Sequence, residues 1–406
     1  MVQREKKGTL IKSCFGRVKD ENTLMKSSSG GAFSALTDLA LNDGDGIVCS
    51  IYDYTSNTLN YQFVADRTDR DRARGSKYFS SNLNTVFREI RKWLNDNPEK
   101  HLIFFGLGCE AAGLAKYLEA VGLRSRVIIV DLICHGSCSQ KLWKDYLDLQ
   151  QKKFGRLSYI TFKDKRNGWR KPVAIGVFDG QEKMLDEYME LFYIATAHRP
   201  SCYDCRFTTK YRYSDITIGD AWGLKGSYGQ ANDDKGYSLF LIHTKEGLEA
   251  FEQCKKSLEY YEIGEEECMQ KNLIHPSPMP LFRSEFWKDY EKKGIQFLIK
   301  KYTRHPSIII HKARIKARIQ RILRMKEQTL DLSESVRYFG EDKNVSGMPP
   351  LLYEKKENCC GCTACYSVCQ VNAIVMEEDR EGYFYPAINL EKCVRCRRCL
   401  TVCPLK

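Results

Sequence analysis

Two runs of cysteines near the C-terminus of this 406-residue chain share one spacing, C-x2-C-x2-C-x3-C. The first run is Cys359, Cys362, Cys365 and Cys369, and the second is Cys393, Cys396, Cys399 and Cys403. Three thiolates at this spacing can wrap a loop around one 4Fe–4S cube, while the fourth starts a short helix that reaches a second cube. The doubled spacing therefore predicts two 4Fe–4S clusters, which would carry electrons.

The same spacing is typical of bacterial two-cluster ferredoxins, in which the fourth cysteine of each run binds the cluster of the other run. The predicted ligand sets are therefore crosswise, with Cys359, Cys362, Cys365 and Cys403 in one set and Cys393, Cys396, Cys399 and Cys369 in the other. Short strands at 373–376 and 383–388 are expected to cover the two clusters. Structural zinc sites or disulfides would not need two four-cysteine runs, and disulfides also require an oxidising compartment.

The composition indicates a cytoplasmic protein. The chain holds 18 cysteines, and residues 1–14 are polar and basic, without the apolar centre of a signal peptide. We identify no apolar run long enough to span a bilayer. The net charge of +12 favours acidic partners, and the sequence contains no recognised nucleic-acid-binding motif.

A β-α-β unit must position further cysteines in the first half of the chain. Residues 102–105 and 127–133 are predicted strands, and 111–121 is the helix between them. The glycine-rich turn 106–113 would let a cofactor approach the backbone at the carboxyl edge of the sheet. Asp131 follows at the distance expected in a nicotinamide site, but it falls inside the apolar second strand, and Cys109 occupies the phosphate position. We therefore predict no nicotinamide site here.

Four cysteines outside the two runs could form a third iron–sulfur site. Cys109 lies in the glycine-rich turn and Cys134 ends the second strand, so both are expected at the same edge of one sheet. Cys202 and Cys205 form a C-x2-C pair. Buried free thiols for the first two, and zinc for the pair, remain alternatives.

Two polar, glycine-containing turns could contact an anionic cofactor. The turn at 26–33 leads into an apolar helix at 33–41, where serines would cap free N–H groups and attract anions. A plain helix cap explains this pattern equally well. The second turn, Gly75-Ser-Lys-Tyr78, follows a basic loop.

These stretches recur in the same order in a known family. The chain resembles the beta-subunit family of coenzyme F420 (deazaflavin) hydrogenases and dehydrogenases over roughly residues 10–300. The motifs that carry this resemblance are Lys26-Ser-Ser-Ser-Gly-Gly, Arg74-Gly-Ser-Lys-Tyr, Asp131-Leu-Ile-Cys-His-Gly, Phe162-Lys-Asp-Lys-Arg-Asn-Gly-Trp, Arg199-Pro-Ser-Cys-x-x-Cys and Ser214-Asp-Ile-Thr-Ile-Gly-Asp-x-Trp-Gly.

The resemblance implies FAD, an inner iron–sulfur cluster in the flavin domain, and electron transfer between them. It implies that the inner cluster is held by Cys109, Cys134, Cys202 and Cys205, and that the flavin is lined by Ser28, Ser29, Gly30, Gly31, Gly75, Ser76, Lys77 and Tyr78. At Gly30, the missing side chain is expected to let the flavin approach the backbone closely.

Two features depart from the family. The turn usually written Gly-Thr-Pro-Cys-Gln is Gly106-Leu-Gly-Cys-Glu110 in this chain. The ferredoxin module lies at the C-terminal instead of the N-terminal end.

We therefore predict an α/β (α+β) flavin-binding domain at 1–271, a basic helical extension and linker at 272–345, and a ferredoxin-like two-cluster domain at 346–406. The predicted function is a flavin-dependent oxidoreductase that passes electrons between 4Fe–4S clusters and FAD, acting on a small organic substrate or a deazaflavin. The alternative is a non-catalytic electron-relay subunit of a larger complex. Arg395, Arg397 and Arg398 could dock an acidic, ferredoxin-like protein or could simply be solvated charges. The basic helical segment 311–325 could rest on an anionic membrane or an acidic partner, or could be a solvated helix that packs through its apolar stripe. The sequence identifies no catalytic residue.

Overall fold

The structure is a computed structural model that describes residues 9–223, 233–303, 334–342 and 347–406, together with the single positions Ile308, His311, Lys312, Ile315 and Arg318. The basic segment predicted at 311–325 lies outside the described residues except at four of these positions. Within the described ranges, no helix combines the length and the apolar character needed to cross a bilayer.

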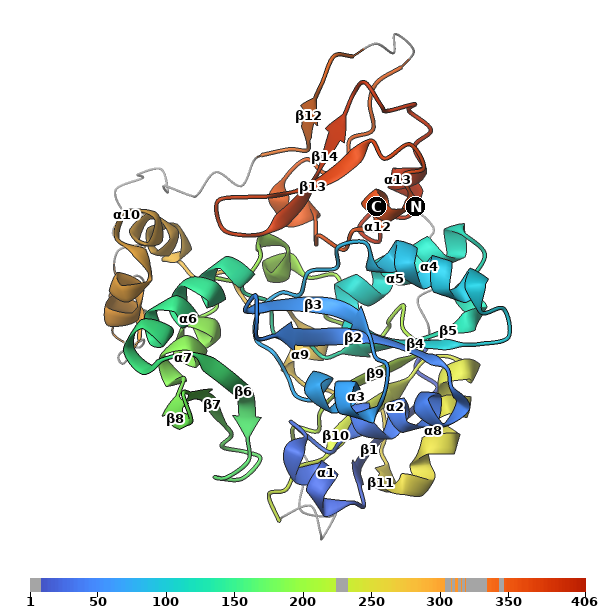
Figure 1. Cartoon of the computed structure of the whole chain (residues 1–406), viewed down its shortest axis with the longest axis vertical. Coiled ribbons are helices and arrows are strands. Elements are labelled where there is room, and N and C mark those ends of the chain that lie inside the picture. Colours follow the sequence, from blue (N-terminus) through green and yellow to red (C-terminus); the bar gives the residue numbers. More distant parts are fainter. Residues whose placement is uncertain are drawn as a thin grey trace.

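An eight-stranded mixed sheet forms the centre of the molecule, in the order β11-β1-β10-β9-β5-β4-β2-β3 (Figure 1). Strands β2, β4, β5 and β9 run parallel to one another, so their carboxyl ends meet at one edge. The strand bounds are β1 Lys12–Val18, β2 Gly46–Asp53, β3 Thr58–Phe63, β4 Leu102–Leu107, β5 Val127–Leu132, β9 Ile216–Asp220, β10 Ser238–Ile242 and β11 Leu258–Glu262.

Helices cover both faces of this sheet. Helices α2 (Ala32–Asp43), α3 (Arg67–Ala73) and α8 (Lys245–Cys254) pack on one face, and α4 (Val86–Asp96) and α5 (Gly108–Ala120) pack on the other. The short helix α1 (Glu21–Lys26) precedes α2, and α9 (Lys271–Ile274) follows β11. The mixed α/β fold predicted from the β-α-β unit is confirmed.

Helix α5 begins three residues earlier than the sequence pattern predicts, at Gly108 instead of residue 111. The Glu110 side chain reaches back and accepts a hydrogen bond from the Leu107 backbone N–H, with an N–O distance of 2.7 Å. This contact satisfies an N–H group that the helix itself leaves free, so the helix can begin directly after β4.

A second layer of helices and a small sheet packs beside the central sheet through an aromatic core. It contains α6 (Gln140–Phe154), α7 (Asp186–Tyr193), α10 (Arg283–Tyr302) and the three-stranded sheet β6 (Leu157–Asp164), β7 (Val173–Phe178) and β8 (Gln181–Met184). Trp143 stacks on Phe79 at 6° with ring centroids 4.9 Å apart, and Tyr188 meets Trp143 edge-on. Stacked and edge-on pairs add to the burial of these large side chains.

The C-terminal module packs on α4 and α5 and is the red part of Figure 1. Its sheet has the order β12-β14-β13, with β12 Arg337–Phe339, β13 Ile374–Glu378 and β14 Phe384–Asn389, and its two short helices are α12 (Ala364–Val368) and α13 (Arg398–Thr401). Strands β13 and β14 match the two strands predicted to cover the clusters. Strand β12 precedes the predicted domain start at 346 and joins this sheet by parallel pairing with β14.

Candidate iron–sulfur relay and flavin site

The first crosswise thiol set lies together in one small pocket. Cys359, Cys362, Cys365 and Cys403 all line it, although Cys403 belongs to the second run. Burial is the largest cause of the raised pKa of the Cys365 thiol, and the charges of Cys359 and Cys403 raise it further. The pKa values of the other three thiols are raised as well. Each of these thiols is therefore protonated in the absence of a metal and must lose its proton to bind iron.

The second set is also crosswise, and it lies closer to the surface. Burial raises the pKa of Cys399 to about 12, with smaller contributions from the charges of Cys369, Cys393 and Cys396. Cys396 is exposed to solvent. The structure thus groups the four thiols of each set and places the second set, which we call the outer set, at the surface.

The two cysteine loops adopt the same backbone conformation. Gly361 and Arg395, each two residues after the first cysteine of its run, have φ values of +70° and +55°. Thr363 and Arg397, each four residues after it, have φ values of +60° and +59°. A left-handed backbone conformation costs free energy for Thr and Arg. Both loops adopt it at the same position, as expected if each loop wraps around the same kind of cluster.

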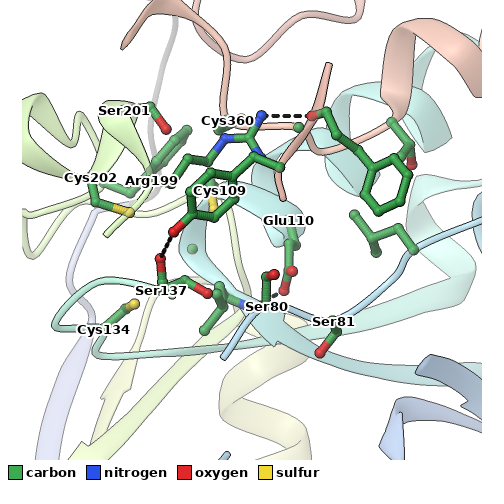
Figure 2. A pocket seen from close by; sticks show the side chains of 18 of the residues that line it. Ser80, Ser81, Cys109, Glu110, Cys134, Ser137, Arg199, Ser201, Cys202 and Cys360 are labelled. Carbon is green, nitrogen blue, oxygen red and sulfur yellow. Dashed lines mark hydrogen bonds between the residues drawn. The ribbon is translucent and has the colours of Figure 1, made fainter. Parts of the chain in front are cut away.

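The four cysteines predicted for an inner cluster surround one cavity of about 430 Å³ at the carboxyl edge of the large sheet. Cys109 is the second residue of α5, Cys134 follows β5, Cys202 lies in the short helix Pro200–Asp204, and Cys205 comes directly after that helix. In Figure 2, Cys109, Cys134 and Cys202 enter the cavity from three separate segments. The chain therefore brings these thiols together.

Burial raises the pKa of Cys202 to about 12, with a further contribution from the charge of Cys205. Burial also raises the pKa of Cys134, and its electrostatic interaction with Cys202 and Cys205 raises it further. Among the described residues, no three Cys, His, Asp or Glu side chains converge on a point where a single metal ion would fit. The inner thiols instead line a cavity of about 430 Å³, which is larger than a site for one metal ion.

Cys360 is a fifth thiol on this cavity, which sequence reasoning did not assign. It lies in the ferredoxin module and also lines the pocket of the first thiol set. The signal in the sequence is the doubled Cys359-Cys360, since only the first of the two fits the ferredoxin spacing.

Glu110, which departs from the family pattern, also lines the cavity. Burial raises the pKa of its carboxyl to about 7, while hydrogen bonds from Tyr61 and the Leu107 N–H lower it. The Tyr61 hydroxyl donates to Glu110 at 2.6 Å. A carboxyl with this pKa can hold or release a proton beside the inner thiols at neutral pH.

Buried polar contacts fix the ferredoxin module on the main body. The Arg199 guanidinium donates to the Cys359 carbonyl at 3.1 Å and to the Phe384 carbonyl at 2.7 Å. The Tyr383 hydroxyl lies 2.8 Å from the Ser137 carbonyl and 2.5 Å from the Ala197 carbonyl. The module therefore docks directly on the segments that carry the inner thiols.

The two turns predicted to line a flavin lie side by side. The Ser76 N–H donates to the Ser28 hydroxyl at 2.8 Å. Lys77 is partly buried, burial lowers its pKa to about 8, and its ammonium donates to the Ala73 and Ser50 carbonyls. The Ser29 hydroxyl donates to the Tyr237 carbonyl at 2.5 Å.

The expectation that Gly30 leaves space for the cofactor is wrong. A Cβ atom at Gly30 would lie 2.3 Å from the Gly16 carbonyl oxygen and 2.4 Å from the Ser238 nitrogen, so this glycine is required by protein packing. Gly31 has φ +87° and is the N-cap residue of α2, where a Cβ atom would meet Val18.

The flavin motif and the thiol cavity are neighbours but not one cavity. None of the eight predicted flavin residues, all described, is among the residues that line the thiol cavity. Tyr78 ends the flavin motif two residues before Ser80, which lines the thiol cavity. Burial is the main cause of the raised pKa of Tyr78, and the charges of Asp220 and Cys134 raise it further. Its ring packs edge-on against Phe192 at 4.7 Å.

Asp131 cannot reach a nucleotide, as its place in the apolar strand predicts. Only 1% of its surface is exposed, and Arg212 pairs with it at 3.2 Å. Burial raises the pKa of this carboxyl, and the guanidinium opposes that effect.

Comparisons with known proteins agree with the cysteine patterns. Residues 99–267 match the family model for the C-terminal part of the beta subunit of coenzyme F420 hydrogenase/dehydrogenase, and residues 358–406 match a 4Fe-4S dicluster domain. The predicted oxidoreductase class and iron–sulfur character are thereby confirmed.

An uncharacterized ferredoxin of Methanocaldococcus jannaschii is 37% identical over 49 residues, which are 12% of this chain and 62% of that protein. A chain of the F420-reducing [NiFe] hydrogenase complex of Methanosarcina barkeri superposes with a TM-score of 0.45 at 17% identity, covering 73% of this chain and 97% of the other. Residues 99–267 thus belong to the beta-subunit family of coenzyme F420 hydrogenases and dehydrogenases, and residues 358–406 belong to the 4Fe-4S dicluster family.

Proposed function

We propose that the chain is an iron–sulfur flavoprotein oxidoreductase that moves electrons through three thiol-bound clusters to a flavin. The observation that carries this proposal is the arrangement of the three thiol sets, which follow one another from the surface to the interior. The outer set lies at the surface, the first set lies next to it, and Cys360 lines both the pocket of the first set and the inner cavity. The charge of Cys399, an outer thiol, acts on Cys365 of the first set.

When bound, 4Fe–4S clusters exchange one electron at a time, and a flavin pairs two of them for an organic substrate. The chain's own residues keep the centres close and dry. Arg199 and Tyr383 close the interface between the ferredoxin module and the inner thiols. Glu110 holds a proton beside Cys109, which would balance negative charge that arrives at the inner site.

The Gly75–Tyr78 turn is the proposed flavin anchor. Within the described residues, no carboxylate forms an ion pair with the Lys77 ammonium, although burial already lowers its pKa. A partly buried cation with only carbonyl partners fits an anionic phosphate. Ser28 positions this turn through Ser76, and Tyr78 continues it toward Cys134.

Anaerobic purification followed by iron, sulfide and flavin analysis tests the proposal. We expect about twelve irons, as three cubes require, and one flavin per chain. The double variant Cys202→Ala/Cys205→Ala should hold about eight irons. Zinc instead of iron at the inner thiols, or a chain that cannot be reconstituted with FAD or FMN, would contradict it.

A further inference from the structure

Arg199 is a buried cation that lies between two thiol sets. Only 8% of its surface is exposed, and it lines the inner cavity together with Cys202 and Cys360 (Figure 2). Its backbone carbonyl accepts a hydrogen bond from the Cys202 N–H at 2.8 Å. Its guanidinium donates to the carbonyl of Cys359, which belongs to the first set, at 3.1 Å. One residue therefore contacts the loops that carry both sets.

The Arg199 guanidinium packs tightly against the ferredoxin module. A Cβ atom at Gly361 would lie 2.7 Å from its nearest nitrogen, so only a glycine leaves room for it there. A second hydrogen bond goes to the Phe384 carbonyl at 2.7 Å. The rings of Tyr383 and Tyr385 lie 5.2 Å and 4.3 Å from the guanidinium carbon, at the distance of a cation–π contact. These contacts fix the position of the positive charge.

No carboxylate in the described part of the chain forms an ion pair with Arg199, whose hydrogen bonds go to carbonyl groups. The buried Glu381 already pairs with Arg283. Glu110 lines the same cavity, but its carboxyl accepts a hydrogen bond from Tyr61. Burial raises the pKa of that carboxyl, and the charge of Arg199 only opposes this effect. A charge buried without a counter-charge costs free energy, so a further anion is expected beside Arg199.

We propose that Arg199 supplies the counter-charge for the first and the inner cluster and raises the reduction potential of both. This inference rests on the inner cluster of the proposed function. Thiolate-bound 4Fe–4S cubes carry negative charge, and each takes up one electron from the donor on reduction, while the guanidinium keeps its proton. A fixed positive charge stabilises the reduced state more than the oxidised state, and burial strengthens this effect because the surrounding dielectric constant is low.

The arginines beside the outer set differ from Arg199. Arg397 is exposed and Arg398 is half-buried, so solvent and salt screen their charges. The charge of Arg395 is paired with Asp342. Arg199 therefore raises the potentials of the first and inner clusters relative to that of the outer cluster, which favours movement of an electron from the surface inward.

A redox titration of the full-length, cluster-loaded chain, followed by electron paramagnetic resonance, tests this inference. Arg199→Gln removes the charge and should lower the midpoint potentials of two of the three clusters. We expect about a tenfold smaller equilibrium constant for reduction, or about 59 mV for a one-electron couple. Arg199→Lys keeps the charge and should shift both potentials less. Tyr383→Phe is the matched control, because it removes two hydrogen bonds at the same interface without changing charge, and it should leave all three potentials unchanged.

Unchanged potentials in Arg199→Gln would overturn the inference. Equal shifts in Arg199→Gln and Arg199→Lys would overturn it as well, because the hydrogen bonds and not the charge would then matter. If Arg199→Gln binds fewer than about twelve irons, iron content decides the question: Arg199→Lys should bind about twelve, and an equal loss in both variants would overturn the inference. About eight irons in the wild type would instead refute the inner cluster of the proposed function, and Arg199→Gln should then lower one of two potentials.

Discussion

At the scale of single residues, position in the fold gives the same side chain different roles. Cys369 and Cys403 are the fourth cysteines of their runs, and each lies with the thiols of the other run. Cys138 and Cys254 are buried and belong to neither thiol cavity. Sequence spacing alone distinguishes Cys369 and Cys403 from Cys138 and Cys254. In each run, a short helix around the third cysteine turns the fourth cysteine toward the other cluster.

Cys403→Ala should damage the cluster of the first run although Cys403 lies in the second. Its thiol shares a pocket with Cys359, Cys362 and Cys365, so its loss leaves one iron of that cube without a thiolate. The electron paramagnetic resonance spectrum of the variant should match that of Cys362→Ala. A spectrum like that of Cys396→Ala would show that the crosswise assignment is wrong.

Glu110 should make the stability of the chain depend on pH. Its folded-state pKa is about 7, raised from 4.5 mainly by burial, so the folded state binds this proton more tightly than the unfolded state. The contribution of this proton to the free energy of unfolding is fully present below pH 4.5 and is lost as the pH rises through 7. The difference between the folded-state and unfolded-state pKa values corresponds to about 3 kcal/mol. Thermal unfolding midpoints of Glu110→Gln should rise relative to wild type between pH 5 and pH 8. Parallel pH profiles for the two proteins would contradict this.

At the scale of elements, contacts between distant segments decide how the ferredoxin module is held. Arg283 at the start of α10 and Glu381 before β14 form an ion pair 2.5 Å apart, with side chains only 3% and 4% exposed. Leu114 and Tyr117 of α5 share a core with Tyr385 and Ile388 of the module. The module and the main body therefore fold as one packed unit.

Arg283→Ala should destabilise the docked module strongly. The change leaves the Glu381 carboxylate buried without its partner, which typically costs about 3–5 kcal/mol. Limited proteolysis should then release the C-terminal module more quickly than in wild type. Arg337→Ala is the control, because the pair between Arg337 and Glu377 is 66% and 36% exposed and contributes under about 1 kcal/mol. Equal protease sensitivity of the two variants would contradict the prediction.

Elements whose signal is local can be predicted from the sequence, whereas contacts that depend on docking cannot. The strand-helix-strand unit and the doubled cysteine spacing repeat at short range, so both are identified directly. Cys360 lines the same cavity as Cys109 only because α5 packs against the module, and nothing near residue 360 encodes that arrangement. The prediction for Gly30 fails for the same reason. The local sequence shows that a glycine is needed in this turn, but it does not show that strands β1 and β10 pack against it.

At the scale of the whole molecule, the outer set is the place where electrons would enter. Arg397 is exposed beside Cys396, and Arg398 is half-buried. Arg395, the third arginine predicted to dock a partner, instead pairs with Asp342. The net charge of +12 adds a long-range attraction for an acidic carrier.

Arg397→Glu/Arg398→Glu should slow reduction of the chain by an acidic ferredoxin about tenfold or more at low salt, with less effect at high salt. Dithionite, which needs no docking surface, should reduce the variant and the wild type equally. Lys245→Glu is the control, since Lys245 is exposed on α8 in the main body. A slower reaction of that variant would assign the effect to net charge instead of to the outer surface.

The direction of electron flow is the last property to test, and the structure favours entry through the clusters. A nicotinamide would need a phosphate-binding turn and a free carboxylate for its ribose. In the turn after β4, Cys109 lines the thiol cavity, and Asp131 is buried against Arg212. Dithionite or reduced ferredoxin should therefore bleach the flavin absorbance quickly in a stopped-flow experiment, whereas NADH and NADPH should do so poorly. Reoxidation should require a two-electron organic acceptor such as a deazaflavin. Fast bleaching by micromolar NADH would reject this direction and would make the Gly106–Gly113 turn a nicotinamide site.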